Sequence, residues 1–376
     1  MLLVLPSLVP SQMAHWRSAQ NLGVDLFVAG TLVQPPSGWW ETRPPTGLET
    51  FVFKPKGWVR RGQLWWFYPG LRRLIETLRP DVIQVENEPW ALFYSQTLGS
   101  GSCVVGHGAD NIWLHGSKPE QWIRIARSRR NLRRMCGLAG WNSAAIALAR
   151  RHGLPVSAPT LIAPSRLPDP VPFSTAARDP QRHRAEFGIG EEVAVGFVGR
   201  LDKQKGVDWL LKSYAQVQSA ASRLYIFGSG PAERTLRRMA EDLAPSVEFV
   251  GDVPYKSMPR LMAALDILVV PSRTTQHLME QFGRVVVEAM YASTAVISSD
   301  SGALPEVVGE GGITVPEDNQ NELADAISAL VSDVELREMW GDRGQSWALE
   351  RWSPRALAAG YVDLWKGAMA FAASTD

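Results

Sequence analysis

The second half of the chain alternates between short apolar runs and amphipathic segments. Residues 193–200 (VAVGFVGR) and 223–230 (RLYIFGSG) each form a β-branched or aromatic run that ends in glycine. Between them, residues 206–218 place apolar side chains at the spacing of one helix face. The same alternation continues to about residue 333. Strands that alternate with helices predict parallel βαβ units, and therefore a doubly wound α/β sheet.

The first half alternates less plainly. Four apolar runs are typical of strands that enter loops, at 23–30, 81–89, 102–110 and 137–143. Residues 163–180 are rich in proline and lack periodicity, which is typical of a linker. The last residues are helical in pattern and have no strand of their own to pack on. We therefore predict two Rossmann-like domains, over residues 1–170 and 171–353, with a C-terminal helix over 354–376 that packs back on the first.

The turn at 199–206 (GRLDKQKG) follows one predicted strand and precedes a helix. Gly199 allows close backbone approach, and Arg200 and Lys205 supply two cations beside a helix N-terminus. Such a turn suits a diphosphate, which both the charges and the N–H groups attract. Open α/β sheets bind ligands at this edge, and two domains in tandem would face their loops across a shared cleft. A solvated basic turn is the alternative interpretation.

The stretch 277–293 (HLMEQFGRVVVEAMYAS) places Glu280 and Glu288 eight positions apart. Three residues that can form a helix start lie between them, Phe282, Gly283 and Arg284. Their backbone N–H groups can meet phosphate oxygens. An ionised Glu288 can accept both hydroxyls of a ribose, and Glu280 can reach hydroxyls beyond the phosphates. Phosphate, ribose and sugar in sequence describe a nucleotide sugar, whereas two ordinary carboxylates around an amphipathic helix are the alternative.

Charge is distributed unevenly along the chain. The net charge is +1, but residues 1–165 hold 18 Lys and Arg against 9 Asp and Glu, and the remainder holds 21 against 29. Two segments of the first half, 53–74 and 121–135, interleave basic residues with large aromatics. This pattern suits an anionic membrane surface, and a plain solvated basic face over packed aromatics is the alternative. Nucleic acid would use the same residue types, but no other feature supports it, so we expect no nucleic-acid partner.

The cysteines and the N-terminus indicate the compartment. Two cysteines, Cys103 and Cys136, are too few for a disulfide scaffold and lack metal-ligand spacing. The apolar start, MLLVLPSLVP, is short and has no basic leader, so we interpret it as a buried strand. No apolar window is long enough to span a bilayer. We expect a cytoplasmic protein, with a peripheral position at the inner face of the membrane left open.

Five motifs of the second half occur in a familiar order and spacing. They are GRLDKQKG (199–206), FGSGP (227–231), GDVPYKSMP (251–259), EQFGRVVVEAM (280–290) and SSDSGALPEVVGEGG (298–312). Together they resemble the donor domain of the glycosyltransferase family 4 enzymes, which have the GT-B fold and whose signature is the E-x7-E pattern of Glu280 and Glu288. The resemblance is strong from about residue 190 to 350 and weaker over the first half.

The resemblance implies a retaining hexosyltransferase-type enzyme that moves a sugar from a UDP or GDP donor to a hydroxyl of a glycan, lipid-linked or small-molecule acceptor. It implies no bound metal and no other cofactor, because the nucleotide sugar is a co-substrate. The first domain would take the acceptor and the second the donor. Such an enzyme would serve polysaccharide or glycolipid biosynthesis.

The match also implies roles for single residues. Arg200 and Lys205 would hold the diphosphate and offset charge on the leaving group. Glu288 would bind the ribose, and Glu280 would position the donor sugar rather than act as a nucleophile. Val253 would lie against the base. The loop of residues 301–303 would approach the sugar or phosphate.

In the first half, the sequence GHG places His107 just after a predicted strand. On an open strand-end loop its imidazole can hydrogen-bond a sugar hydroxyl or stabilise developing charge, as the family's histidine at this place suggests. A structural or merely exposed histidine is the alternative. Glu86 and Glu88 end another strand, where a capping or solvated role is favoured over an acceptor contact. The loop at 6–13 (PSLVPSQM) lacks the glycine-rich pattern that family members commonly carry there.

Two other functions fit the same fold. A sugar-nucleotide epimerase can share it but rarely needs the E-x7-E pattern together with paired basic residues. A nucleotide-sugar-binding protein without transferase activity would keep the fold and lose the chemistry. The intact set of Glu280, Glu288, Arg200 and Lys205 favours the transferase.

Overall fold

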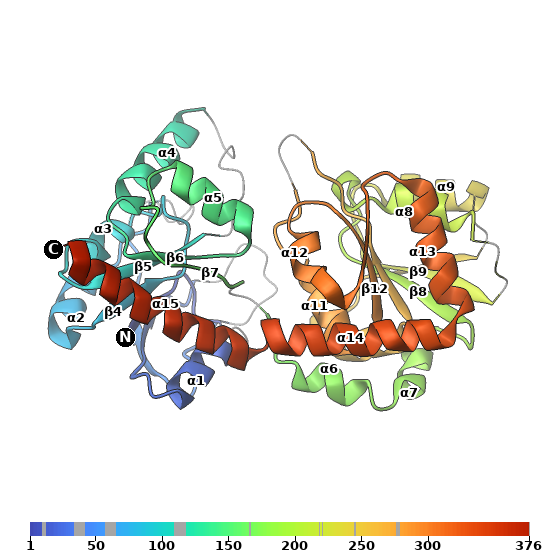
Figure 1. Ribbon diagram of the computed structural model, residues 1–376, viewed down its shortest axis with the longest axis horizontal. Helices are drawn as coiled ribbons and strands as arrows, with labels where there is room; N and C mark the ends of the chain where they lie inside the picture. Colours follow the sequence, from blue (N-terminus) through green and yellow to red (C-terminus); the bar gives the residue numbers. More distant parts are fainter. Residues whose placement is uncertain are drawn as a thin grey trace. The chain divides into compact units, whose positions relative to one another are not determined.

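The structure is a computed structural model that describes residues 1–9, 13–33, 42–56, 65–108, 118–164, 167–217, 219, 221–243, 246–275 and 279–375. The chain divides into two units, Met1–Pro168 with Pro354–Asp376, and Asp169–Ser353 (Figure 1). Each unit has one parallel sheet covered by helices. The predicted α/β class with two Rossmann-like sheets is therefore confirmed. Trp58, Arg60 and Arg61 of the basic segment lie outside the described residues, as do parts of the stretches 6–13 and 277–293.

The sheet of the first unit has seven parallel strands in the order β3-β2-β1-β4-β5-β6-β7. The order reverses on the two sides of β1, which is the switch point where such sheets place ligands. The strands are β1 (Leu2–Val4), β2 (Phe27–Gly30), β3 (Glu49–Val52), β4 (Val82–Val85), β5 (Cys103–Gly108), β6 (Gly137–Gly140) and β7 (Thr160–Ile162). The helices are α1 (Ala14–Asn21), α2 (Leu71–Leu78), α3 (Tyr94–Thr97), α4 (Lys118–Leu132), α5 (Ser143–Arg151) and α15 (Pro354–Thr375).

The second unit repeats this plan with six strands in the order β10-β9-β8-β11-β12-β13. The strands are β8 (Val193–Val198), β9 (Ser222–Phe227), β10 (Val247–Gly251), β11 (Ile267–Val270), β12 (Ala295–Ser299) and β13 (Ile313–Val315). The helices are α6 (Val171–Ala176), α7 (Pro180–Arg184), α8 (Val207–Tyr214), α9 (Glu233–Leu243), α10 (Met258–Ala264), α11 (Arg284–Tyr291), α12 (Leu304–Val308), α13 (Gln320–Ser332) and α14 (Val334–Trp352).

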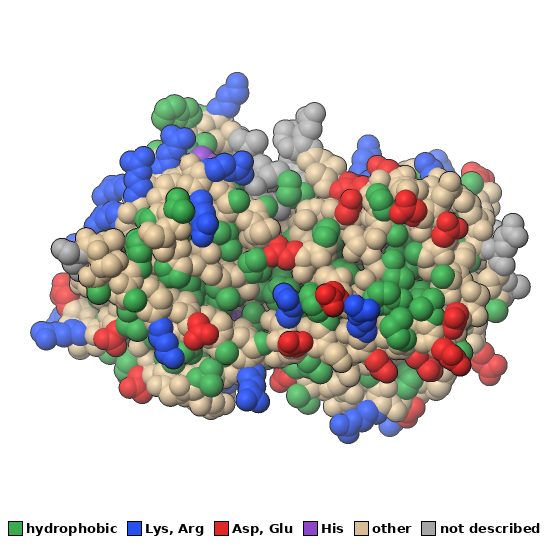
Figure 2. Space-filling view, in the orientation of Figure 1, with side chains coloured by type: hydrophobic (Ala, Val, Ile, Leu, Met, Phe, Trp, Pro, Cys, Tyr) green, Lys and Arg blue, Asp and Glu red, His purple; other side chains and the backbone are tan. Residues whose placement is uncertain are grey.

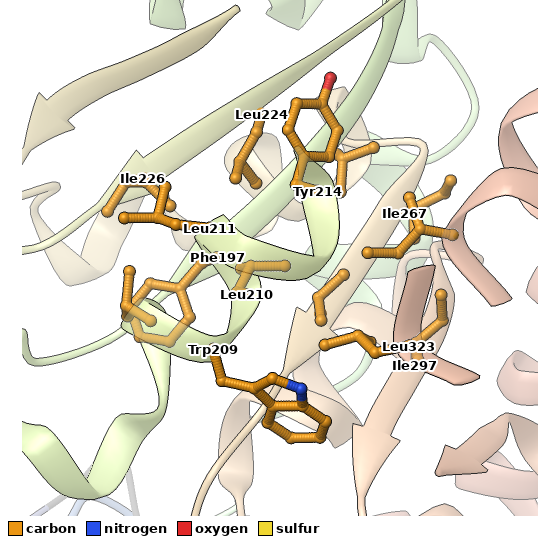
Figure 3. Packing of buried hydrophobic residues seen from close by; sticks show 14 of the residues in the cluster. Phe197, Trp209, Leu210, Leu211, Tyr214, Leu224, Ile226, Ile267, Ile297 and Leu323 are labelled. Atoms are coloured by element: carbon orange, nitrogen blue, oxygen red, sulfur yellow. The ribbon is translucent and has the colours of Figure 1, made fainter. Parts of the chain in front are cut away.

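One apolar cluster holds the second unit together. The helical face predicted in the sequence is buried, since Val207, Leu210, Leu211 and Tyr214 of α8 all lie in this cluster. They meet side chains of β8, β9 and β11 and of helix α13 (Figure 3). Burial of each large aliphatic side chain contributes roughly 1.5–3 kcal/mol to the stability of the folded unit. The edge of the sheet above these side chains is therefore firmly held. The loops that follow β8, β9 and β11 therefore begin from firmly held strand ends.

The predicted linker is not irregular throughout. Within residues 163–180 the chain forms helix α6, which begins at a proline-rich turn and buries Phe173. The Phe173 ring packs against Tyr291 of α11, with ring centroids 6.1 Å apart. Two apolar positions were too few to show a helical period, so the sequence indicated a loop where packing stabilises a short helix.

Several aromatic side chains of the segment 53–74 are packed against other side chains of the first unit. Trp66 and Tyr68 are buried in the apolar cluster of the first unit. Arg127 of α4 covers the ring of Trp65 at 4.6 Å, and Arg124 covers that of Trp90 at 4.7 Å. Part of the basic–aromatic pattern is thus internal cation–π packing. For these residues the alternative of packed aromatics holds.

Candidate functional site

The turns after β8 and β9 pack backbone against backbone. The N–H of Leu201 donates to the carbonyl of Ser229 at 2.8 Å. A Cβ at Gly228 would lie 2.0 Å from the carbonyl oxygen of Gly199, and one at Gly230 would lie 2.3 Å from that of Leu201. The glycines of the two sequence motifs therefore serve a close approach of two loops. This approach fixes the backbone at the carboxyl ends of both strands.

Lys205 occupies a short 3-10 turn between β8 and α8. Asp202 caps this turn, because its carboxylate accepts the N–H of Gln204 at 3.1 Å. Gly206 then adopts a left-handed conformation with φ of 66°, and a Cβ there would lie 1.8 Å from the carbonyl oxygen of Pro271. Only glycine fits such a contact. The turn is thereby pressed against the end of β11, and Lys205 is presented toward the loop that follows.

The structure brings Lys205 and Glu280 together. The Lys205 ammonium lies 2.6 Å from Glu280 Oε2, and the Ser272 hydroxyl donates to the same oxygen at 2.8 Å. Ser272, two residues after β11, is fully buried. The backbone of Glu280 is fixed as well, since its carbonyl accepts the N–H of Ala303 at 3.0 Å. A carboxylate with one cation and one hydroxyl on a single oxygen retains acceptor capacity for a ligand hydroxyl.

Arg200 is not part of this contact. Its side chain is 72% exposed, and its Nε lies 3.6 Å from a carboxylate oxygen of Asp202. Lys205, in contrast, is only 28% exposed. Of the two cations predicted to hold a diphosphate, the structure places Lys205 beside Glu280 and leaves Arg200 at the surface of the same turn.

Glu288 is buried on α11. Burial raises the pKa of its carboxyl to about 7, while the Arg284 guanidinium and a hydrogen bond from Tyr255 act in the opposite direction. The Tyr255 hydroxyl donates to Glu288 Oε1 at 3.3 Å. Tyr255 lies two residues beyond Val253, in a 3-10 turn after β10. Tyr255 belongs to the motif at 251–259, but no local pattern indicates its contact with Glu288.

The start of α11 has the form that the sequence predicts. Gly283 adopts φ of 76° and precedes the first helical residue, Arg284, without a side-chain cap. Phe282 is buried with its ring edge-on to Trp352 at 5.1 Å, so only its backbone can face a ligand. The N–H groups of this first turn and the helix dipole together favour an anion.

The loop after β12 closes on the Glu280 backbone. Gly302 has φ of 55°, and a Cβ there would lie 2.3 Å from the carbonyl oxygen of Glu280. The Ser301 hydroxyl lies 3.0 Å from that of Thr274, which also hydrogen-bonds Glu317. Ser272 and Thr274 were not predicted as site residues. They lie two and four residues beyond β11, and this place after an apolar strand is the signal that could have found them.

His107 is not on an open loop, and that prediction is wrong. It lies inside β5, which continues to Gly108 because its residues pair with β6 as far as Gly140. The side chain is buried, and its Nε2 lies 3.8 Å from Glu86 Oε2. Glu86 is also buried rather than solvated: its Oε1 accepts a hydrogen bond from Gln84 at 2.9 Å.

Comparison with known proteins gives a consistent result. Residues 192–333 match the family model described as glycosyl transferases group 1. A GDP-mannose-dependent alpha-(1-6)-phosphatidylinositol monomannoside mannosyltransferase of Mycolicibacterium smegmatis is 28% identical over 295 residues, covering 69% of this chain and 77% of that protein. A protein of the same name from Mycobacterium tuberculosis is 33% identical over 208 residues, covering 53% of this chain and 52% of its own.

Solved structures agree on the fold. Anabaena Alr3699/HepE in complex with UDP has a TM-score of 0.72 and 20% identity, and the match covers 97% of this chain and 99% of that one. At this identity the likeness concerns the fold. The match covers only about half the length of the Mycobacterium tuberculosis relative.

Proposed function

We propose that the chain, whose second unit carries a glycosyl transferases group 1 domain, is a retaining transferase of a sugar from a nucleoside diphosphate. The observation that carries the proposal is the contact of Lys205 with Glu280 at the strand ends of the second unit. A cation and a carboxylate fixed side by side suit a ligand whose phosphate oxygens and sugar hydroxyls lie close together, because the cation binds the former and the carboxylate the latter. Glu288 lies on α11, which begins four residues after Glu280.

In this proposal each group has one task. The N-terminal N–H groups of α11 and the Lys205 ammonium bind the diphosphate, and Lys205 offsets charge as the phosphate leaves. Glu288 accepts the ribose hydroxyls, Tyr255 steadies Glu288, and Val253 lies against the base. Glu280 holds the donor sugar. The acceptor attacks from the face that the diphosphate leaves, and the leaving phosphate takes the proton of the acceptor hydroxyl, so neither a metal nor another cofactor is required.

A nucleotide panel tests the function directly. Purified protein is melted with UDP, GDP and their sugars, and GDP-mannose comes first because the mycobacterial relatives are named for it. A ligand at 100 times its Kd adds about 2.7 kcal/mol to the folded state, which gives a clear rise in Tm. We expect one base to stabilise the protein more than the other. The absence of any shift would overturn the proposal, and tight binding without transfer or donor hydrolysis would favour a non-catalytic binding protein.

We further propose that the acceptor is a lipid or a lipid-linked glycan at an anionic membrane surface. Among the described residues no helix is long and apolar enough to cross a membrane. Basic side chains nevertheless gather over α4 of the first unit (Figure 2). Arg129 and Arg130 of α4 are exposed, and Trp122 on the same helix is 78% exposed. An exposed indole flanked by arginines suits the boundary between lipid headgroups and acyl chains.

Vesicle binding tests the basic surface of α4. We expect the double variant Arg129→Ser/Arg130→Ser to bind vesicles of anionic lipid about tenfold or more weakly, since each cation near the headgroups contributes about 1 kcal/mol. Co-sedimentation measures the partition. The matched control removes two exposed arginines from α9 of the second unit, Arg234→Ser/Arg238→Ser. Equal losses in the two variants, or equal binding to neutral vesicles, would contradict a docking role for α4.

A further inference from the structure

A buried polar cluster lies at the strand ends of the first unit, and the proposed transfer does not yet use it. His107 of β5 and Glu86, directly after β4, face each other across adjacent parallel strands. Their nearest side-chain atoms are 3.8 Å apart, and both side chains are at most 5% exposed. A buried carboxylate at this distance from an imidazole strongly favours the protonated ring. Burial without such a partner would favour the neutral ring.

The C-terminal helix α15 holds the carboxylate in place. The Tyr361 hydroxyl donates to Glu86 Oε1 at 3.4 Å, and Gln84 donates to the same oxygen at 2.9 Å. Gln84 is fixed in turn, because the Trp365 indole N–H donates to its side-chain oxygen at 3.0 Å. Two residues one helical turn apart thus secure Glu86 directly and through Gln84. Burial and the Glu86 charge raise the pKa of Tyr361 well above its ordinary value, so the hydroxyl keeps the proton that it donates.

Several other titratable or aromatic groups lie near His107 among the described residues. His15 of α1 is buried, and burial, assisted by His107, lowers its pKa to about 3, so it brings no second positive charge at neutral pH. Tyr94 accepts the backbone N–H of His107 at 3.2 Å and stays neutral because burial raises its pKa. Glu88 lies close to the next residue, Gly108, and adds negative charge of the same sign as Glu86. The Trp141 ring stands edge-on to the imidazole at 6.3 Å.

The packing of α15 accounts for its hold on Glu86. Tyr361 and Trp365 are buried together with Leu357, Leu364 and Ala368 on one face of the helix. Trp16 of α1 packs on the Tyr361 ring, with centroids 4.6 Å apart. In Figure 1 α15 runs along the sheet of the first unit that contains β4 and β5. The face predicted only to cover the first unit therefore also carries two hydrogen-bond donors into its polar cluster.

We propose that Glu86 is a positioning residue for His107, and that α15 locks Glu86 so that the imidazole stays protonated and oriented at the strand-end edge of the first unit. The inference rests on the proposed function for the use of that charge, which is to donate a hydrogen bond to a sugar hydroxyl at this edge of the first unit. Glu86 itself need not touch substrate. The acceptor contact that the sequence left open for Glu86 is replaced by this role.

The test follows the His107 ring in the unliganded protein. Histidine Cε1–H signals are titrated by NMR from about pH 5 to about pH 8.5, around the ordinary range of imidazole, and His107 is assigned with His107→Gln. We expect Glu86→Gln to lower the His107 titration midpoint by about one unit or more. Tyr361→Phe should shift it in the same direction by less. Tyr68→Phe is the matched control, because it removes a buried tyrosine hydroxyl that contacts Leu5 rather than Glu86.

The outcomes separate this inference from the proposed function. A His107 midpoint that moves no further in Glu86→Gln and Tyr361→Phe than in Tyr68→Phe overturns the inference, whatever the enzyme does. Should Glu86→Gln fail to fold, Tyr361→Phe alone decides. With an active donor, kcat/KM of Glu86→Gln should fall on the alkaline side at a lower pH than that of the wild type, by the same amount as the His107 midpoint. A merely structural role would lower the rate equally at every pH. If the His107 midpoint shifts but the protein binds no nucleotide, the proposed function is wrong, whereas the pairing of His107 with Glu86 stands.

Discussion

Replacing Lys205 by alanine is expected to lower the turnover number for sugar transfer by about 10²–10³-fold, the loss typical of removing one preorganised group that stabilises developing charge. The ammonium is fixed 2.6 Å from Glu280, so in the proposed site it would meet the diphosphate without reorganisation. Among the described residues, its loss leaves the Ser272 hydroxyl as the hydrogen-bond donor to the Glu280 carboxylate. Nucleoside diphosphate binding should weaken severalfold or more. Steady-state kinetics with the donor found in the nucleotide panel measure the first effect, and calorimetry measures the second.

The matched control for this prediction lies in the same turn. Lys203 is exposed, two residues before Lys205 and also in the 3-10 segment. Lys203→Ala removes an equal charge from the same edge of the sheet without touching Glu280, and it is expected to change the turnover number less than twofold, as for a screened surface charge. If the two variants lose activity equally, long-range attraction of the donor explains the effect. The assignment of Lys205 to the reacting groups would then be wrong.

The second unit could be predicted well because its site is assembled from local turns at the ends of adjacent strands. Lys205 and Glu280 are far apart in sequence, yet β8 and β11 pair in parallel, so the residues that follow them meet at one edge. A Cβ at residue 206 or 302 would lie only 1.8 or 2.3 Å from a backbone carbonyl oxygen, which explains why each turn requires glycine. The roles of single residues toward a ligand stay predictions.

The first unit could be predicted less well because its polar residues take partners from distant parts of the chain. Glu86 read alone is a carboxylate after a strand, and such residues are rarely buried unless paired. Its partner Tyr361 lies 275 residues later, on a helix with no local signal of a polar contact. His107 was placed on a loop because two flanking glycines are turn signals. In the structure β6 keeps pairing through those glycines, so the strand extends past the histidine.

Glu288→Gln is expected to stabilise the protein by about 1–3 kcal/mol at pH 8 and to leave its stability nearly unchanged below about pH 4.5. The folded-state pKa of about 7 lies above the ordinary 4.5 of an unfolded glutamate. At low pH the carboxyl is protonated in both states and costs nothing. Between about 4.5 and 7 the unfolded chain loses the proton first, so stability falls as pH rises, and above 7 the full cost of about 3 kcal/mol is present. The neutral amide removes that cost.

Urea unfolding midpoints at the two pH values measure the effect, and Glu241→Gln, an exposed glutamate of α9, is the control, with an expected change within about 0.5 kcal/mol at either pH. The same variant should bind nucleoside diphosphate severalfold less tightly, because an ionised carboxylate accepts the ribose hydroxyls more strongly than an amide. Wild-type affinity should rise between about pH 6 and pH 8 as Glu288 ionises. If Glu288→Gln gains stability and loses affinity for nucleoside diphosphate, the carboxylate is buried at a cost in stability because it binds the ligand. Unchanged nucleotide binding in both Glu288→Ala and Lys205→Ala would refute the nucleotide site.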